Sequence, residues 1–309
     1  MKLRIFTEPQ QGASYDQLLV VAREAEALGF DAFFRSDHYL KMGTASGLPA
    51  YTDAWTTLAG LARDTETIRL GTLVTPTTFR RPGPLAVTVA QVDHMSHGRL
   101  EVGLGAGWFE EEHRNYGIPF PPVGERFDLL EDQLAVLHGV WKAEPGTVFR
   151  HEGRTLSVEL EVSPLRPAQA PHPPVIMGGG GGPRNSRLAA TYADEFNAPF
   201  MGRDEVSKVF GSVRRACEAQ GRDPRSLRWS TAQVVCCGRD EAEVARRARA
   251  IDREPDELRQ NGLTGSPAEV ADKLHAYAEA GAGTCYLQIL DLADLDHLRL
   301  LAEQVLPVV

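Results

Sequence analysis

The chain has 309 residues, of which 42% are apolar and 24% charged, proportions typical of a folded globular protein. The net charge of −9 argues against general nucleic-acid binding, which needs a basic face, and no apolar run is long enough to cross a membrane. The four cysteines show no Cys-x-x-Cys spacing, so we expect reduced thiols in a cytoplasmic protein, with neither disulfides nor a zinc site.

Apolar periodicity and turn residues predict that strands alternate with helices along the chain. Strands are predicted at 3–7, 32–35, 68–74, 100–105, 175–177, 195–197, 227–236 and 284–290. Helices are predicted at about 14–28, 53–63, 85–95, 126–141, 183–192, 204–220, 240–251 and 267–280, with a last one ending near 305. Residues 142–174 are predicted to be an excursion that contains a small hairpin. This pattern predicts one domain over 1–309, an α/β fold of the (β/α)8 TIM-barrel type with loop insertions at its C-terminal face; a doubly wound open sheet is the alternative.

The most unusual residues follow four of the predicted strands. These segments are Asp37-His38, Leu73-Val74-Thr75, Gly105 to Trp108, and the five glycines Gly178 to Gly182. In a barrel the carboxyl ends of the strands form one rim, where active sites lie. We therefore expect the four segments to converge on one site.

Two of these segments suggest specific chemistry. Asp37 and His38 place a carboxylate next to an imidazole that titrates near neutrality, so the pair can hold a cofactor group and move a proton; an ordinary turn is the alternative. The glycines precede a predicted helix, so their N–H groups can bind a phosphate, with Arg184 and Arg187 as nearby cations; a flexible connector is the alternative. Their spacing is not a dinucleotide-binding fingerprint.

Two other polar clusters are predicted to be structural. The run Glu110-Glu-Glu-His113 is interpreted as a solvated loop or helix start in preference to a metal site. The segment Asp93 to Arg99 precedes a strand and is interpreted as a turn on the opposite face of the barrel.

Six segments carry motifs that occur together in one family. They are residues 27–34, 36–38, 70–76, 98–108, the glycine loop with Arg187 and Ala193-Asp194, and 265–271. In these segments, and over nearly its whole length, the chain resembles the bacterial luciferase-like flavin and deazaflavin oxidoreductases. It most closely resembles their coenzyme F420-dependent branch. The resemblance implies a barrel with the cofactor ring across its C-terminal mouth.

The resemblance also implies roles for individual residues. His38 would be catalytic at the reactive edge of the ring, and a non-proline cis peptide would join Leu73 to Val74. The cofactor-binding residues that it implies are Asp37, His38, Leu73, Val74, Thr75, Ala106, Gly107, Trp108, Gly178, Gly179, Gly180, Gly181, Gly182 and Arg187.

The resemblance implies coenzyme F420 as the cofactor, with FMN as the alternative. Members that oxidise sugar phosphates have a carboxylate in the stretch where this chain has Trp108. This difference favours hydride transfer from reduced F420 to an activated C=C or C=N bond of a small flat or apolar substrate. An FMN-dependent monooxygenase and a non-catalytic flavin-binding barrel are the alternatives.

The resemblance also bears on partners. The acidic tail of F420 would need cations at the mouth, for which Arg80, Arg81 and Arg203 are candidates. Relatives are commonly dimers, so a homodimer is expected, with no metal, nucleic acid or membrane as a partner.

Overall fold

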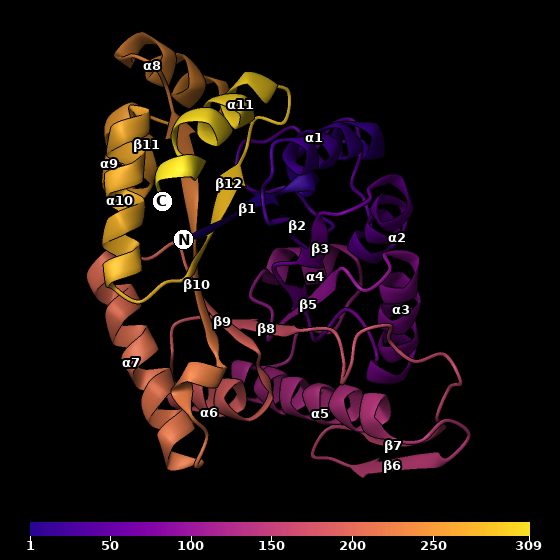
Figure 1. The fold of residues 1–309 in the computed structure, drawn as a ribbon. Helices are drawn as coiled ribbons and strands as arrows, with labels where there is room; N and C mark the ends of the chain where they lie inside the picture. Colours follow the sequence, from indigo (N-terminus) through magenta and orange to yellow (C-terminus); the bar gives the residue numbers. More distant parts are fainter.

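The computed structural model describes residues 1–309, and it contains a closed barrel of eight parallel strands (Figure 1). The barrel strands are β1 (Lys2–Thr7), β2 (Ala32–Arg35), β3 (Arg69–Thr72) with its continuation β4 (Thr75–Pro76), β5 (Leu100–Gly105), β8 (Val175–Gly178), β9 (Glu195–Pro199), β10 (Arg228–Cys237) and β12 (Thr284–Ile289). They pair in that order, and β12 pairs with β1 to close the ring. The predicted TIM barrel is confirmed, and the open sheet is wrong because the ring has no free edge.

Helices surround the barrel (Figure 1). They are α1 (Tyr15–Ala27), α2 (Ala54–Asp64), α3 (Pro82–Met95), α4 (Glu110–Asn115), α5 (Val123–Lys142), α6 (Pro183–Tyr192), α7 (Arg203–Ala219), α8 (Glu241–Ala250), α9 (Pro255–Asn261), α10 (Pro267–Glu279) and α11 (Leu295–Gln304). Four of these helices begin after a side-chain cap: Ser14, Asp53, Asp240 and Ser266 each accept a backbone hydrogen bond at a helix start. No helix combines the length and the apolar character that crossing a membrane requires.

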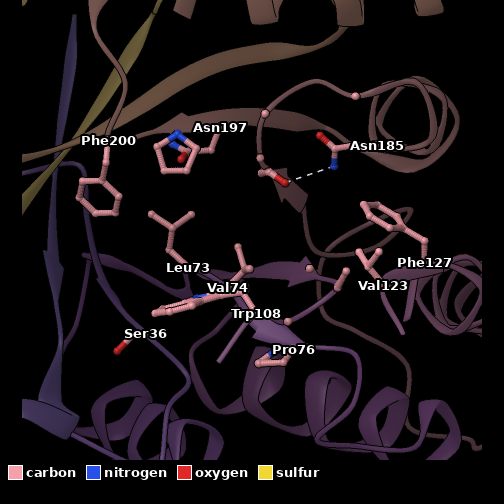
Figure 2. Close-up of a pocket in the computed structure, with 18 of the residues that line it drawn as sticks. Ser36, Leu73, Val74, Pro76, Trp108, Val123, Phe127, Asn185, Asn197 and Phe200 are labelled. Carbon is pink, nitrogen blue, oxygen red and sulfur yellow. Dashed lines mark hydrogen bonds between the residues drawn. The ribbon is translucent and has the colours of Figure 1, made fainter. Parts of the chain in front are cut away.

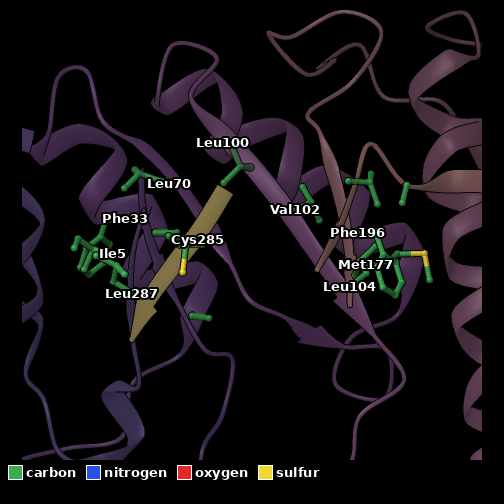
Figure 3. Packing of buried hydrophobic residues seen from close by; sticks show 14 of the residues in the cluster. Ile5, Phe33, Leu70, Leu100, Val102, Leu104, Met177, Phe196, Cys285 and Leu287 are labelled. Carbon is green, nitrogen blue, oxygen red and sulfur yellow. The ribbon is translucent and has the colours of Figure 1, made fainter. Parts of the chain in front are cut away.

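The main core lies between the strands and the helices. Successive side chains of a strand point to opposite faces, so Leu100, Val102 and Leu104 face outward toward the helices while Glu101 faces into the barrel. Figure 3 shows the same outward layer continuing over neighbouring strands with Ile5, Phe33, Leu70, Met177, Phe196, Cys285 and Leu287. All four cysteines are buried and free.

The amino-terminal end of the barrel interior is filled by charged side chains. The Arg4 guanidinium lies 2.9 Å from Glu101 and 3.5 Å from Glu195, and the hydroxyl of Tyr286 donates to Glu195 at 2.7 Å. We call Arg4, Glu101, Glu195 and Tyr286 the base cluster. All four side chains are buried. Above the cluster lies a small apolar layer that includes Phe6.

The structure adds short elements that the sequence pattern did not predict. The strand β11 (Leu263–Gly265) pairs with β10 outside the ring, and α9 precedes it. The helices α3 and α5 each begin three residues before the predicted start. The predicted hairpin is confirmed as β6 (Val148–Glu152) and β7 (Ser157–Glu161), and it is attached to α5 through Asp132, which accepts hydrogen bonds from Thr155.

Candidate functional site

A cavity of about 800 Å³ lies at the C-terminal end of the barrel. All four of the predicted segments contribute to its lining. The predicted residues that line it are His38, Leu73, Val74, Ala106, Gly107, Trp108, Gly178, Gly179, Gly180 and Gly182. Figure 2 shows Leu73, Val74 and Trp108 on one side of the space, with Asn185 and Asn197 across from them. Segments far apart in the sequence therefore share one cavity, and their roles in binding stay predictions.

Two predicted residues lie behind the cavity wall. Asp37 and Thr75 are buried, and the Thr75 hydroxyl donates to Asp37 at 2.8 Å. Asp37 also forms an ion pair with Arg80. Neither side chain lines the cavity: Asp37 is directed toward Arg80 of the loop that follows β4, and the Thr75 hydroxyl accepts from Nε1 of Trp55 in α2 at 3.1 Å.

Arg187 and Gly181, two more of the predicted cofactor-binding residues, do not line the cavity. Arg187 is bidentate to Glu131 of α5, at 2.9 and 2.6 Å, and does not line the cavity. The cation at the cavity is Arg184, one helical turn closer to the glycines. Gly181 has a left-handed φ of 65°, and its Cα faces Val209 of α7 instead of the cavity.

The imidazole of His38 is held from behind by Glu112. Nδ1 of His38 lies 2.9 Å from Oε2 of Glu112, and Oε1 accepts from the backbone N–H groups of Tyr39 and Leu40. Both Glu112 and His113 are buried. The predicted helix start is confirmed as α4, but the prediction of a solvated run is wrong for these two residues. Nothing in the local sequence distinguishes Glu112 from Glu110 and Glu111, and its contacts with residues 38–40 in the loop after β2 come from tertiary structure.

The carboxyl group that lines the cavity itself is that of Glu8, directly after β1. Burial raises the pKa of Glu8, and the nearby His38 opposes this effect. Sequence reasoning missed this residue, although its place immediately after a barrel strand was a usable signal. The wall thus holds an imidazole and a carboxyl group that can both exchange protons.

The outer part of the cavity is apolar and exposed. Trp108 is 66% exposed, Val123 58% and Phe200 49%, and all three line the cavity. The indole of Trp108 stacks on Phe109 with ring centroids 5.3 Å apart and presents an edge contact to His38 at 5.9 Å. Exposed apolar side chains that gather on one cavity indicate a binding surface for a ligand.

The inner part of the cavity fits a flat ring with a hydroxylated, phosphorylated side chain. The Leu73–Val74 peptide is cis, as the resemblance implies, and it packs close to β5: a Cβ on Gly105 would lie 2.8 Å from Val74. Added Cβ atoms on Gly180 and Gly182 would meet no protein atom, so these backbones border open space at the start of α6. Such a helix start binds phosphate through its N–H groups.

Two buried amides support this fit. The side chains of Asn185 and Asn197 use their Nδ2 groups within the protein, on the Gly178 carbonyl at 3.2 Å and the Ser230 hydroxyl at 3.0 Å. Their Oδ1 atoms are buried and have no hydrogen-bond partner. Both residues line the cavity. Unpaired buried acceptors need donors, and hydroxyl groups of a polyol chain between ring and phosphate are suitable ones.

The candidate cations for an acidic cofactor tail are mostly paired within the protein. Arg80 is held by Asp37 and Asp53, so it is not free to bind such a tail. Arg203 contacts Asp204 at 3.1 Å, whereas Arg81 is exposed. Arg184 contacts Asp128 at 2.6 Å.

These features define an α/β barrel with a cavity at its C-terminal mouth, bordered by a cis peptide and by a glycine loop at the start of a helix. The family described as luciferase-like monooxygenase matches residues 1–255, so the chain belongs to that family. The chain spans only 64% of the length of the mycobacterial relatives that it matches at 30% identity.

The relatives include proteins of both cofactor types. The F420-dependent hydroxymycolic acid dehydrogenase of Mycobacterium tuberculosis is 29% identical over 239 residues, 77% of this chain and 62% of that protein. The oxygenase component of the flavin-dependent trigonelline monooxygenase of Acinetobacter baylyi is 24% identical over 315 residues, 90% of this chain and 84% of that protein. The fold is that of the monooxygenase RslO1 of Streptomyces bottropensis, with a TM-score of 0.79, 24% identity and 99% of each chain covered.

Proposed function

We propose that the protein is a coenzyme F420-dependent oxidoreductase that carries out hydride transfer from the reduced deazaflavin to an activated C=C or C=N bond of a small organic substrate. The observation that supports it is one cavity bordered by His38, the cis Leu73–Val74 peptide and the glycine loop. The F420-dependent relative that covers 77% of this chain supports the choice of cofactor.

Different residues around the cavity would bind the cofactor and supply the proton. Bound reduced F420 supplies a hydride. The N–H groups around Gly180 would bind its phosphate, and the Leu73–Val74 peptide would support one face of its ring. Hydride addition to one atom of the double bond leaves the other atom in need of a proton. His38, which lines the same cavity, can supply that proton.

The exposed apolar surface of Trp108, Val123 and Phe200 favours a flat or apolar substrate. These side chains offer dispersion and stacking contacts but no charge. The tight pairing of Arg184 with Asp128 leaves no free cation in the lining for a substrate phosphate.

An FMN-dependent monooxygenase is the alternative, and one observation favours it. Arg80 and Arg203, two of the three cations considered for the acidic tail of F420, are paired with carboxylates. FMN has no such tail and would need only a phosphate-binding site, which the glycine loop at the start of α6 offers. The flavin-dependent relative that covers 90% of this chain supports the same alternative. A non-catalytic flavin-binding barrel would show cofactor binding without turnover.

Titration of the purified protein with F420 and with FMN, followed by difference spectroscopy, tests the cofactor. We expect saturable binding of F420 and oxidation of reduced F420 by members of an enone and imine panel. Replacement of His38 with Ala should lower turnover by about 10²–10⁴-fold, a much larger effect than on cofactor affinity, because the glycine loop and the Leu73–Val74 peptide would remain. Binding of FMN alone, or no oxidation by any panel member, would contradict the proposal.

We also propose that the protein is a homodimer, as is common among the proteins that it resembles. Light scattering during size-exclusion chromatography measures the mass in solution. A mass near twice the 33.8 kDa of the chain is expected, and a monomer at micromolar concentration would contradict the proposal.

A further inference from the structure

We propose that Glu112 is a positioning residue that fixes the tautomer of His38, so that the neutral ring keeps its hydrogen on Nδ1 and presents an unprotonated Nε2 to the cavity. The tautomer itself does not depend on the identity of the cofactor. Only its effect on turnover rests on the proposed function. The two claims therefore have separate measurements.

The contacts of Glu112 determine which ring nitrogen of His38 carries the hydrogen. Its side chain is fully buried, and Oε1 accepts from two backbone N–H groups, those of Tyr39 and of Leu40 at 2.9 Å. Oε2 faces Nδ1 of His38 at 2.9 Å. A carboxylate is an acceptor only, so Nδ1 must be the donor in this contact.

The other ring nitrogen is left for a ligand. Nε2 of His38 has no hydrogen-bond partner in the protein and is not among the buried unpaired atoms, and the ring lines the cavity. The aromatic rings of Trp108 and Phe109 pack against its sides at 5.9 and 6.1 Å. Glu112 and Glu8 are the charged groups that face the imidazole. A proton can therefore enter and leave the ring at Nε2, while the bond at Nδ1 stays in place.

This arrangement explains why a buried glutamate is useful behind the cavity. If the tautomer were reversed, Nε2 of the neutral ring would be a donor and could not accept a proton. With Nδ1–H fixed, Nε2 is an acceptor in the neutral ring and a donor in the cation. The negative charge of Glu112 also stabilises the cation that forms when Nε2 gains a proton.

Nitrogen-15 NMR of histidine-labelled protein without cofactor tests the tautomer. In the wild-type protein at alkaline pH, His38 should show a protonated Nδ1 and an unprotonated Nε2; its signals are assigned by their loss in a His38→Asn variant. In Glu112→Gln, the amide oxygen can keep the two backbone N–H donors, so the amide NH2 must face Nδ1. The tautomer should then reverse. Glu111→Gln, in the exposed part of the same run, is the matched control and should match the wild type.

Steady-state kinetics of the variant, with reduced F420 and a substrate that the wild-type protein reduces, are a second measurement. Glu112→Gln should lower kcat by about 10²-fold or more and leave KM within about threefold. The reversed neutral ring could donate its Nε2 hydrogen only by becoming an imidazolate anion, whereas the cation that Glu112 stabilises donates and becomes neutral. A wild-type ring protonated at Nε2 would overturn the proposal even if the variant failed to fold. An unchanged tautomer in a folded Glu112→Gln would overturn it as well. Absence of all F420 turnover would contradict the proposed function but leave the tautomer result valid.

Discussion

The neighbours Asp37 and His38 show how two adjacent side chains acquire different roles. Along an extended segment, successive side chains point to opposite sides, so one faces the cavity and the other faces the protein. His38 lines the cavity, whereas Asp37 is bonded to Thr75 and paired with Arg80. Sequence reasoning placed both against the cofactor, because the motif does not show which way each side chain turns.

The buried position of Asp37 leads to a prediction about stability. Asp37→Asn removes the charge that partners Arg80 inside the protein, and Asp53 then remains as the charged partner of that guanidinium, beside the Tyr39 hydroxyl at 3.0 Å. The free energy of unfolding should fall by about 1.5–3 kcal/mol, the usual contribution of a hydrogen bond to a charged group. Urea denaturation followed by circular dichroism measures this change.

A matched control comes from an exposed ion pair. Asp204 is 81% exposed and contacts Arg203, so Asp204→Asn should change the free energy of unfolding by less than about 1 kcal/mol. Equal effects of the two substitutions would contradict the structural role of Asp37.

At the scale of elements, Asp53 at the start of α2 connects this helix to the loops that surround the cavity. Asp53 caps this helix by accepting from the backbone of Thr56, and it also accepts from the hydroxyl of Tyr39 at 2.7 Å. Its other partner is Arg80. One carboxylate therefore joins the helix to two segments of the loops around the cavity.

These contacts predict a pH dependence. Burial alone would raise the pKa of Asp53, but the Thr56 N–H, the Arg80 cation and the Tyr39 hydroxyl lower it to about 2. Because the folded pKa lies below the unfolded value of about 3.9, the stabilisation is complete above about pH 5 and is lost as pH falls through 2. Asp53→Asn keeps the cap but loses the charge. It should reduce the free energy of unfolding by about 1 kcal/mol at pH 7, after allowance for solvent screening, and by almost nothing near pH 2.

Denaturation at a series of pH values measures this difference. The control is Asp240→Asn at the start of α8, where the carboxylate accepts from the backbone of Glu243 and makes no ion pair. Its effect should not vary in the same way with pH. A pH-independent effect of Asp53→Asn would show that the charge is not what stabilises this helix.

Most elements could be predicted from the sequence because their signals are local. The predicted strand at 100–105 and the predicted helix at 267–280 each depend on the pattern of a few neighbouring residues. The strand β11 has three residues and α9 has seven, too few for a period to appear. The early starts of α3 and α5 were missed because prolines and glycines at helix starts resemble loop composition.

At the scale of the whole molecule, the barrel explains why the site could be predicted only in part. Its geometry brings strand ends to one rim, so the convergence on His38, Trp108 and the glycines followed from the fold. Pairings between distant side chains did not follow from it. The bonds of Glu112 to the loop after β2 and of Arg187 to α5 depend on tertiary placement, which no local pattern records.

The base cluster at the opposite end leads to a prediction about the barrel itself. Glu101→Gln removes a buried charge that faces Arg4, whose side chain is only 2% exposed. Arg4 loses one charged hydrogen-bond partner and keeps Asp31 at 2.7 Å and Glu195 at 3.5 Å, so the free energy of unfolding should fall by about 1.5–3 kcal/mol. Binding of the cofactor should be unchanged, since the cluster lies at the far end of the strands from the cavity.

Denaturation and cofactor titration on the same variant measure both expectations. Glu159→Gln is the control, because Glu159 and its partner Arg150 are 64% and 65% exposed, and its effect should stay below about 1 kcal/mol. Loss of cofactor affinity in a folded Glu101→Gln variant would contradict the separation of the two ends.

Side chains fill the amino-terminal half of the barrel interior, and this affects the order in which ligands can enter the cavity. With the base cluster and Phe6 beneath the cavity, two ligands must share one entrance. A ligand seated against Leu73 and Val74 would lie inside the exposed surface of Trp108, so it would have to arrive first and leave last. Initial-rate kinetics should then follow a compulsory order, and a large excess of the outer ligand should slow exchange of the inner one.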